Sequence, residues 1–169
     1  MVSLLCAGAL GWAAGESAAV DQAVRSAAHS YDTEGNGRLL DRDEQALLSR
    51  LGQLVPEDAV VVGNPWTGTA LVYALADRAA LTPHVFWTDT ADSWLILNHL
   101  DEAVPGGEVC AAIERTGAYY ALDFGTVGVH GEAPDPPGLD NLADNPSVQL
   151  IDQAGQARLY RVTACAEGP

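Results

Sequence analysis

The sequence predicts an α/β fold, namely a three-layer domain with a mostly parallel sheet and a C-terminal antiparallel β-hairpin. Residues 59–62, Ala-Val-Val-Val, form an apolar, mainly β-branched run followed by a polar turn and a helical pattern, which is typical of a buried strand and its crossover. A helical segment, a glycine and a second strand-like segment follow in the same order at residues 108–124. Near the C-terminus, apolar and polar residues alternate on both sides of a glycine-containing turn, which predicts the hairpin.

The composition indicates one globular domain and excludes a nucleic-acid-binding surface. The chain has 169 residues, of which 48% are hydrophobic and 18% are charged, so it can bury a real core. It carries 23 acidic and 8 basic residues, a net charge of −15, and contains no lysine. Such a surface repels phosphate backbones and anionic lipid headgroups, so we expect no nucleic-acid partner.

The first twenty residues are apolar and contain a single charged residue, Glu16. The uncharged run within them is shorter than the roughly 20 residues that span a bilayer, and it lacks the basic start of a signal peptide. Two interpretations remain: this segment is the end of a transmembrane helix, or it is an apolar helix that packs on the domain. Residues 21–169 are expected to form the single α/β domain.

A helix is expected at residues 17–30, and two interpretations fit the stretch that follows. Its oxygen-bearing residues have the spacing of a calcium-binding EF-hand loop: Asp32, Glu34, Asn36 and Asp43. Glu34 is too long for its position in such a loop, and Asp43 stands where a bidentate glutamate is expected. Alternatively, Asp41 and Glu44 form a capping box that opens a helix containing Leu47, Leu48, Leu51 and Leu54. We favour the capping box, and we expect no cofactor other than this calcium candidate.

The turn at residues 64–68 follows the first predicted strand, and ligands of open α/β sheets bind beyond the carboxyl ends of strands. It lacks the spacing and the lysine of a phosphate-binding loop. A short helix follows the turn, and a second strand is expected at residues 81–87. Trp66 is favoured as a shield for the edge of the core. The candidate ligand-binding residues are Asn64, Trp66, Thr67, Gly68, Trp87 and Asp123.

The remaining elements are predicted by their start and stop signals. Helices are expected at residues 91–100, after the capping cluster at 88–90, and at 108–115, before Gly117. A third strand at 118–124 precedes a long irregular segment at 125–145, and the hairpin strands are placed at 148–152 and 157–163. His84 and His99 are interpreted as surface or capping residues, because no third metal ligand has a suitable spacing.

Two further questions stay open on the residues alone. Asn64, Asp123 and His130 could form the rim of a stand-alone enzyme, but no nucleophilic serine or cysteine motif accompanies them, so we name no catalytic residue. The cysteines, Cys6, Cys110 and Cys165, lack the spacing of a zinc site. Cys110 and Cys165 are equally compatible with a disulfide, worth roughly 3–4 kcal/mol, and with two buried thiols.

Several segments together resemble the C-terminal extracytoplasmic domain of actinobacterial multi-pass membrane proteins of unknown function, which are allied to the GT-C type (lipid-linked-sugar) glycosyltransferases. These segments are VPEDAVVVGNPWTGTALVYALADR, HVFW, VCAAIERTGAYYALDFG, GLDNL and VQLIDQAGQARLYRVTAC, and the resemblance covers residues 40–165.

The resemblance implies a domain at the cell membrane, on its extracytoplasmic side, with the Cys110–Cys165 disulfide formed. In the GT-C type enzymes the catalytic acid lies on a loop between membrane helices, which is not among these residues. The expected function is therefore non-catalytic: binding a glycan or lipid-linked sugar for the membrane portion of the parent protein.

Overall fold

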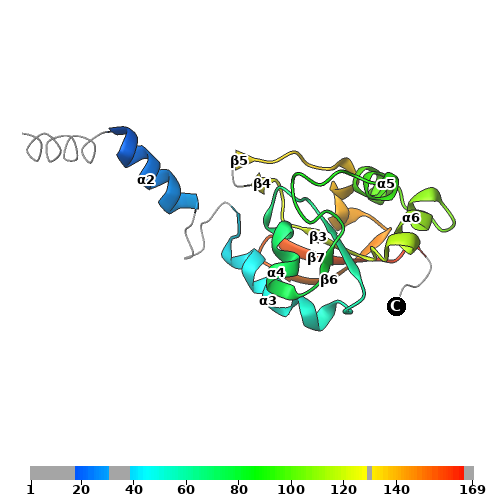
Figure 1. The fold of residues 1–169 in the computed structure, drawn as a ribbon. Coiled ribbons are helices and arrows are strands. Elements are labelled where there is room, and N and C mark those ends of the chain that lie inside the picture. The colour runs from blue at the N-terminus through cyan, green and yellow to red at the C-terminus, as the bar shows by residue number, and fades with distance from the viewer. Residues whose placement is uncertain (1–17, 31–38, 129–130, 166–169) are drawn as a thin grey trace, which may run out of the picture.

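The computed structural model describes residues 18–30, 39–128 and 131–165 (Figure 1). Four earlier expectations therefore lie outside the described residues: the apolar segment up to residue 17, the calcium candidates Asp32, Glu34 and Asn36, the rim histidine His130, and any role of Cys6. Within the described part of the chain, no helix combines the length and the apolar character that crossing a membrane requires.

Two helices precede the sheet, and the capping box predicted for the second is confirmed. Helix α2 spans Ala18–Ser30, and helix α3 spans Arg42–Leu54. The Asp41 carboxylate accepts the Glu44 N–H at 2.8 Å, and the Glu44 carboxylate accepts the Asp41 N–H at 2.7 Å. Of the four leucines expected in this helix, Leu47, Leu48 and Leu51 are buried in the core, and Leu54 is half-buried against it.

The central sheet has five strands in the order β2-β1-β3-β7-β6. Strand β1 (Val60–Gly63) pairs in parallel with β2 (Ala79–Ala80) on one side and with β3 (Tyr120–Asp123) on the other. Strand β7 (Ala157–Val162) pairs antiparallel with both β3 and β6 (Val148–Ala154). The predicted class is thus confirmed, with the antiparallel hairpin at one edge of the sheet.

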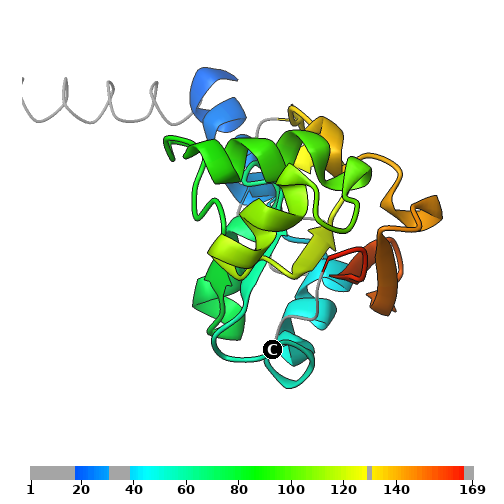
Figure 2. The same cartoon turned by 90° about the vertical axis from the view of Figure 1, so that its right-hand side faces the viewer.

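Helices cover both faces of the sheet and complete three layers. Helix α3 packs with α4 (Val72–Ala76), which continues the 3₁₀ turn η1 (Gly68–Leu71), on one face (Figure 1). Helices α5 (Ala91–His99) and α6 (Glu108–Thr116) pack together on the other face, toward the viewer in Figure 2. Helix α6 ends at Gly117, whose φ of +72° is left-handed, as the glycine signal predicted.

The segment between β3 and the hairpin contains only short elements. These are β4 (Val127–Gly128) and β5 (Gly131–Glu132), which form a separate antiparallel pair, and the 3₁₀ turns η3 (Pro137–Leu139) and η4 (Leu142–Asp144). A further 3₁₀ turn, η2 (Leu100–Glu102), extends α5.

The predicted strand at residues 81–87 is wrong. The Leu81 N–H still bonds the Val61 carbonyl at 2.9 Å, but Pro83 has no N–H to continue such a ladder. The chain then turns, and the Trp87 N–H bonds the His84 carbonyl at 3.0 Å. Phe86 is 88% exposed and Trp87 is 44% exposed, so the aromatic residues at the end of the predicted strand lie on the surface.

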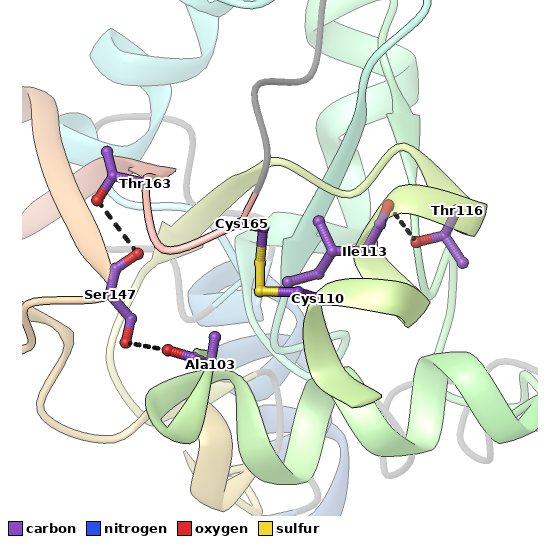
Figure 3. Close-up of a disulfide and its surroundings, with 7 residues drawn as sticks. All are labelled: Ala103, Cys110, Ile113, Thr116, Ser147, Thr163 and Cys165. Carbon is purple, nitrogen blue, oxygen red and sulfur yellow. Dashed lines mark hydrogen bonds between the residues drawn. A yellow bond between two sulfur atoms is a disulfide. The ribbon is translucent and has the colours of Figure 1, made fainter. Parts of the chain in front are cut away.

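A disulfide joins Cys110 on α6 to Cys165, just beyond β7, with Cα atoms 5.1 Å apart (Figure 3). The predicted pairing is therefore confirmed. Beside it, the Ser147 hydroxyl donates to the Ala103 carbonyl at 2.9 Å, and the Thr163 hydroxyl donates to the Ser147 carbonyl at 3.4 Å (Figure 3). These bonds connect the entry and exit of the hairpin to the α5–α6 layer.

Candidate functional site

The turn after β1 is held in place by Asn64, one of the predicted ligand-binding residues. Asn64 is only 3% exposed. Its amide nitrogen donates to the Pro134 carbonyl at 2.7 Å, and its amide oxygen accepts the Trp66 N–H at 3.1 Å. Asn64 therefore joins the turn to the irregular segment after β5, which brings two distant parts of the chain to the same edge of the sheet.

Thr67 and Gly68 form the framework of this turn rather than its surface. The Thr67 hydroxyl is fully buried and donates to the Asn64 carbonyl at 2.8 Å, and Thr67 is the N-cap of η1. A Cβ atom on Gly68 would lie 2.9 Å from the Leu39 carbonyl oxygen, so the close approach of these backbones requires glycine.

Trp66 and Trp87, also predicted as ligand-binding residues, line the same surface pocket of about 300 Å³. Trp66 is 39% exposed and Trp87 is 44% exposed, so both rings are accessible to a ligand. The His84 ring meets the Trp87 ring edge-on, with centroids 6.0 Å apart. The polar residues of this tryptophan pocket are Thr82, His84, Asp89, Asn98 and Asp135, and its remaining wall includes Pro134, Pro136 and Pro137.

A second pocket of about 440 Å³ adjoins the tryptophan pocket. The two share a wall formed by Pro65, Trp66, His84, Val85 and Pro134. The second pocket is mainly apolar, because most of its other walls come from Leu39, Ala70, Ala133 and two glycines, with Glu132 as the acidic exception. A polar and an apolar cavity thus lie on either side of one tryptophan.

Asp135 gives the tryptophan pocket a carboxyl group that changes charge in mildly acidic solution. Burial raises the pKa of Asp135 to about 6, and a side-chain hydrogen bond and charge repulsion from Asp140 act in the same direction. The carboxyl can therefore accept a hydrogen bond from a ligand hydroxyl when ionised, or donate one when protonated.

Asp123 lies in a different cavity, against the N-terminus of α3. Its carboxylate accepts the Gly125 N–H at 3.0 Å and pairs with the Arg158 guanidinium at 3.3 Å. The structure therefore brings Trp66 and Trp87 together in one pocket, whereas Asn64, Thr67 and Gly68 do not line it and Asp123 lines another pocket. The enzyme hypothesis needs His130, outside the described residues, and stays a prediction.

The calcium hypothesis also stays a prediction. Of its four residues, only Asp43 is described, and its side chain is exposed. Among the residues that the structure places, no group of three or more histidine, cysteine, aspartate or glutamate side chains is arranged to hold a metal ion.

Sequence reasoning missed the polar wall of the tryptophan pocket. Asp135, Asn98 and Thr82 come from three separate segments that meet only in the folded chain. The proline-rich stretch at residues 134–137 was noted as irregular, but its contact with the turn depends on the Asn64 side chain. No pattern in the local sequence predicts such a contact.

Comparison with known proteins gives a family and a fold. The model of a family of unknown function, DUF6541, matches residues 1–164. A search of the curated proteins finds no match to the sequence. Among solved structures, the C-terminal globular domain of an oligosaccharyltransferase from Archaeoglobus fulgidus is similar, with a TM-score of 0.51 and 13% identity. The match covers 73% of this chain and 99% of that one, and at this identity it shows a shared fold.

Proposed function

We propose that this chain, which belongs to the family of unknown function DUF6541, is a non-catalytic part of a glycosyltransferase-like membrane protein. We propose further that it binds a glycan or lipid-linked sugar. The fold shared with the C-terminal globular domain of an oligosaccharyltransferase supports this proposal. The binding site is the tryptophan pocket at the carboxyl end of β1.

The observation that carries the proposal is the combination of two accessible tryptophans with polar groups in one pocket. An indole face packs well against the C–H face of a sugar ring, because both surfaces are apolar and flat. Asp89, Asn98 and Asp135 can then exchange hydrogen bonds with the hydroxyl groups at the ring edge.

The neighbouring apolar pocket suits the hydrocarbon part of a lipid-linked sugar. It shares the Trp66 wall with the tryptophan pocket, so one amphiphilic molecule could place its sugar in the first and the start of its chain in the second. This arrangement favours a lipid-linked sugar over a free one.

The disulfide supports a location on the extracytoplasmic side of the cell membrane. Disulfides persist mainly in oxidising compartments and are rare in the cytosol. The Cys110–Cys165 bridge is therefore consistent with a domain that acts outside the membrane, with the membrane portion of the parent protein as its partner.

The proposal is tested by titrating the protein with defined oligosaccharides and short-chain lipid-linked sugars, using calorimetry or amide chemical shifts. Trp66→Ala and Trp87→Ala should each weaken binding by about tenfold, because each removes one aromatic wall of the pocket. Trp94→Ala is the matched control, since Trp94 is similarly exposed but lies on α5, outside this pocket.

Equal weakening by all three substitutions would point to non-specific contact with tryptophan. Unchanged binding in both pocket variants would reject the site, and the absence of binding across the glycan set would reject the function.

A further inference from the structure

Two neutral polar side chains of the tryptophan pocket already use hydrogen atoms to bond the protein itself. The Thr82 hydroxyl is buried and donates to the Gly63 carbonyl at 3.3 Å, so its oxygen remains as an acceptor. The Asn98 amide nitrogen donates to the Trp94 carbonyl at 2.8 Å. Within the described residues no hydrogen bond reaches the Asn98 amide oxygen, which is therefore a second acceptor for a ligand.

Two carboxyl groups add further acceptors to this pocket. Asp89 and Asp135 line it, and an ionised carboxylate can only accept hydrogen bonds. In the part of the chain that the structure describes, Asp89 takes part in no hydrogen bond or ion pair. Burial and the neighbouring Asp140 carboxyl raise the pKa of Asp135 to about 6, so a positive group beside Asp135 would relieve this repulsion.

The donors of the pocket are fewer and lie mainly on its aromatic rings. They are the ring N–H groups of Trp66, His84 and Trp87 and the second N–H of Asn98. None of the residues that line the pocket is an arginine, and the chain contains no lysine. A carboxylate on a ligand would place acceptor against acceptor at Asp89 or Asp135, whereas an ammonium group has three donors and no acceptor.

We propose that the tryptophan pocket binds amino sugars in preference to uronic acids. The sugar ring packs on Trp66 and Trp87, and a free ammonium group on the ring donates to the Asp135 carboxylate. This inference rests on the proposed sugar-binding function and names the class of sugar that the site takes. Asp135 is then the residue that determines specificity, and the two tryptophans supply affinity for any sugar ring.

The test uses methyl glycosides that differ in one group. They are the methyl glucoside, its 2-amino-2-deoxy and 6-amino-6-deoxy derivatives, and the methyl glucuronide, together with the same four compounds of the galacto series. Each is added up to about 50 mM, a range that reveals millimolar dissociation constants, while the amide shifts of Thr82, Trp87 and Asn98 are followed. The titrations are made at pH 7, above the Asp135 pKa of about 6.

We expect the better of the two amino sugars to bind about fivefold more tightly than the neutral glycoside, which is the size of a favourable exposed ion pair. The glucuronide should bind at least about fivefold more weakly than the neutral glycoside, because its carboxylate meets acceptors at the ring edge. All four compounds share the ring that contacts the tryptophans, so the differences report on the polar groups alone.

Substitutions separate the Asp135 contact from the overall charge of the protein. Asp135→Asn should lower the ratio of amino-sugar to neutral-sugar affinity from about five to about one. Asp58→Asn removes the same charge at an exposed position outside the pocket, so it should leave that ratio unchanged despite the net charge of −15. Trp87→Ala should weaken the neutral and the amino sugars by the same factor, because it removes a contact with the ring.

The inference is overturned if the glucuronide binds as tightly as the amino sugars, or if Asp135→Asn leaves the ratio unchanged. It is also overturned if Asp58→Asn lowers the ratio as much as Asp135→Asn does. Equal affinities for all the glycosides would reject the inference and leave the sugar site standing. If neither series binds, the inference fails, and the wider set of glycans and lipid-linked sugars then decides the proposed function separately.

Discussion

Replacing Glu44 with glutamine should remove a large part of the pH dependence of stability between pH 4.5 and pH 8. Glu44 titrates with a pKa of about 7 in the folded protein, against an ordinary value of 4.5, chiefly because it is buried. The folded state therefore binds the Glu44 proton more tightly than the unfolded state does. The resulting stabilisation is fully present below pH 4.5 and is lost as the pH rises through 7.

The difference between the two pKa values sets the size of the effect. A pKa of about 7 in place of 4.5 corresponds to at most about 3 kcal/mol of unfolding free energy, and relaxation around an ionised carboxylate reduces this figure. Glutamine has no charge to bury and can still accept the Asp41 N–H. The variant should therefore gain stability relative to the natural protein as the pH rises, by about 2 kcal/mol at pH 8.

The measurement is urea unfolding of both proteins at pH 5, 6, 7 and 8, with Glu57→Gln as the control at an exposed glutamate. The control should follow the natural protein at every pH. A difference between Glu44→Gln and the natural protein that stays constant from pH 5 to pH 8 would refute the reasoning, because it would mean that Glu44 titrates alike in both states.

Two other predictions concern the framework. Replacing Cys110 and Cys165 with alanine should lower the unfolding free energy by about 4 kcal/mol, since the bridge closes a loop with a sequence separation of 55; reducing agent should then have no further effect on denaturation. Thr67→Ala should cost about 1–2 kcal/mol in thermal or urea unfolding, because it removes a buried hydroxyl that caps η1 and bonds the turn. Thr67→Ser should recover most of that loss, and equal destabilisation by serine would contradict the role of the hydroxyl.

Local signals in the sequence predicted much of the fold. The capping box of Asp41 and Glu44, the left-handed stop at Gly117 and the hairpin turn each depend on residues a few positions apart. Strand β1 was predicted from its valines, because a run of β-branched residues buried on both faces suits a parallel strand. The packing of these helices and strands then produces the three layers of the fold.

The features that the sequence did not predict correctly depend on tertiary contacts. The apolar residues at 84–87 suggested a strand, but Pro83 interrupts pairing and Phe86 points outward. The capping role of Glu44 was predicted from its spacing to Asp41. Its burial depends on the close approach of Gly68, where an added Cβ atom would lie 3.1 Å from the Glu44 carboxylate. The tryptophan pocket likewise exists because Asn64 holds the distant Pro134 segment.

The disulfide also decides how this domain would respond to mechanical tension. A force applied to the two ends of the chain passes from Cys165 directly to Cys110, so it bypasses β3, β6 and β7. Stretching the oxidised domain would leave a covalent loop that cannot lengthen, and its contour length would be shorter by about 190 Å than that of the reduced chain. While the bridge is intact, β3 and the hairpin therefore carry no part of the load.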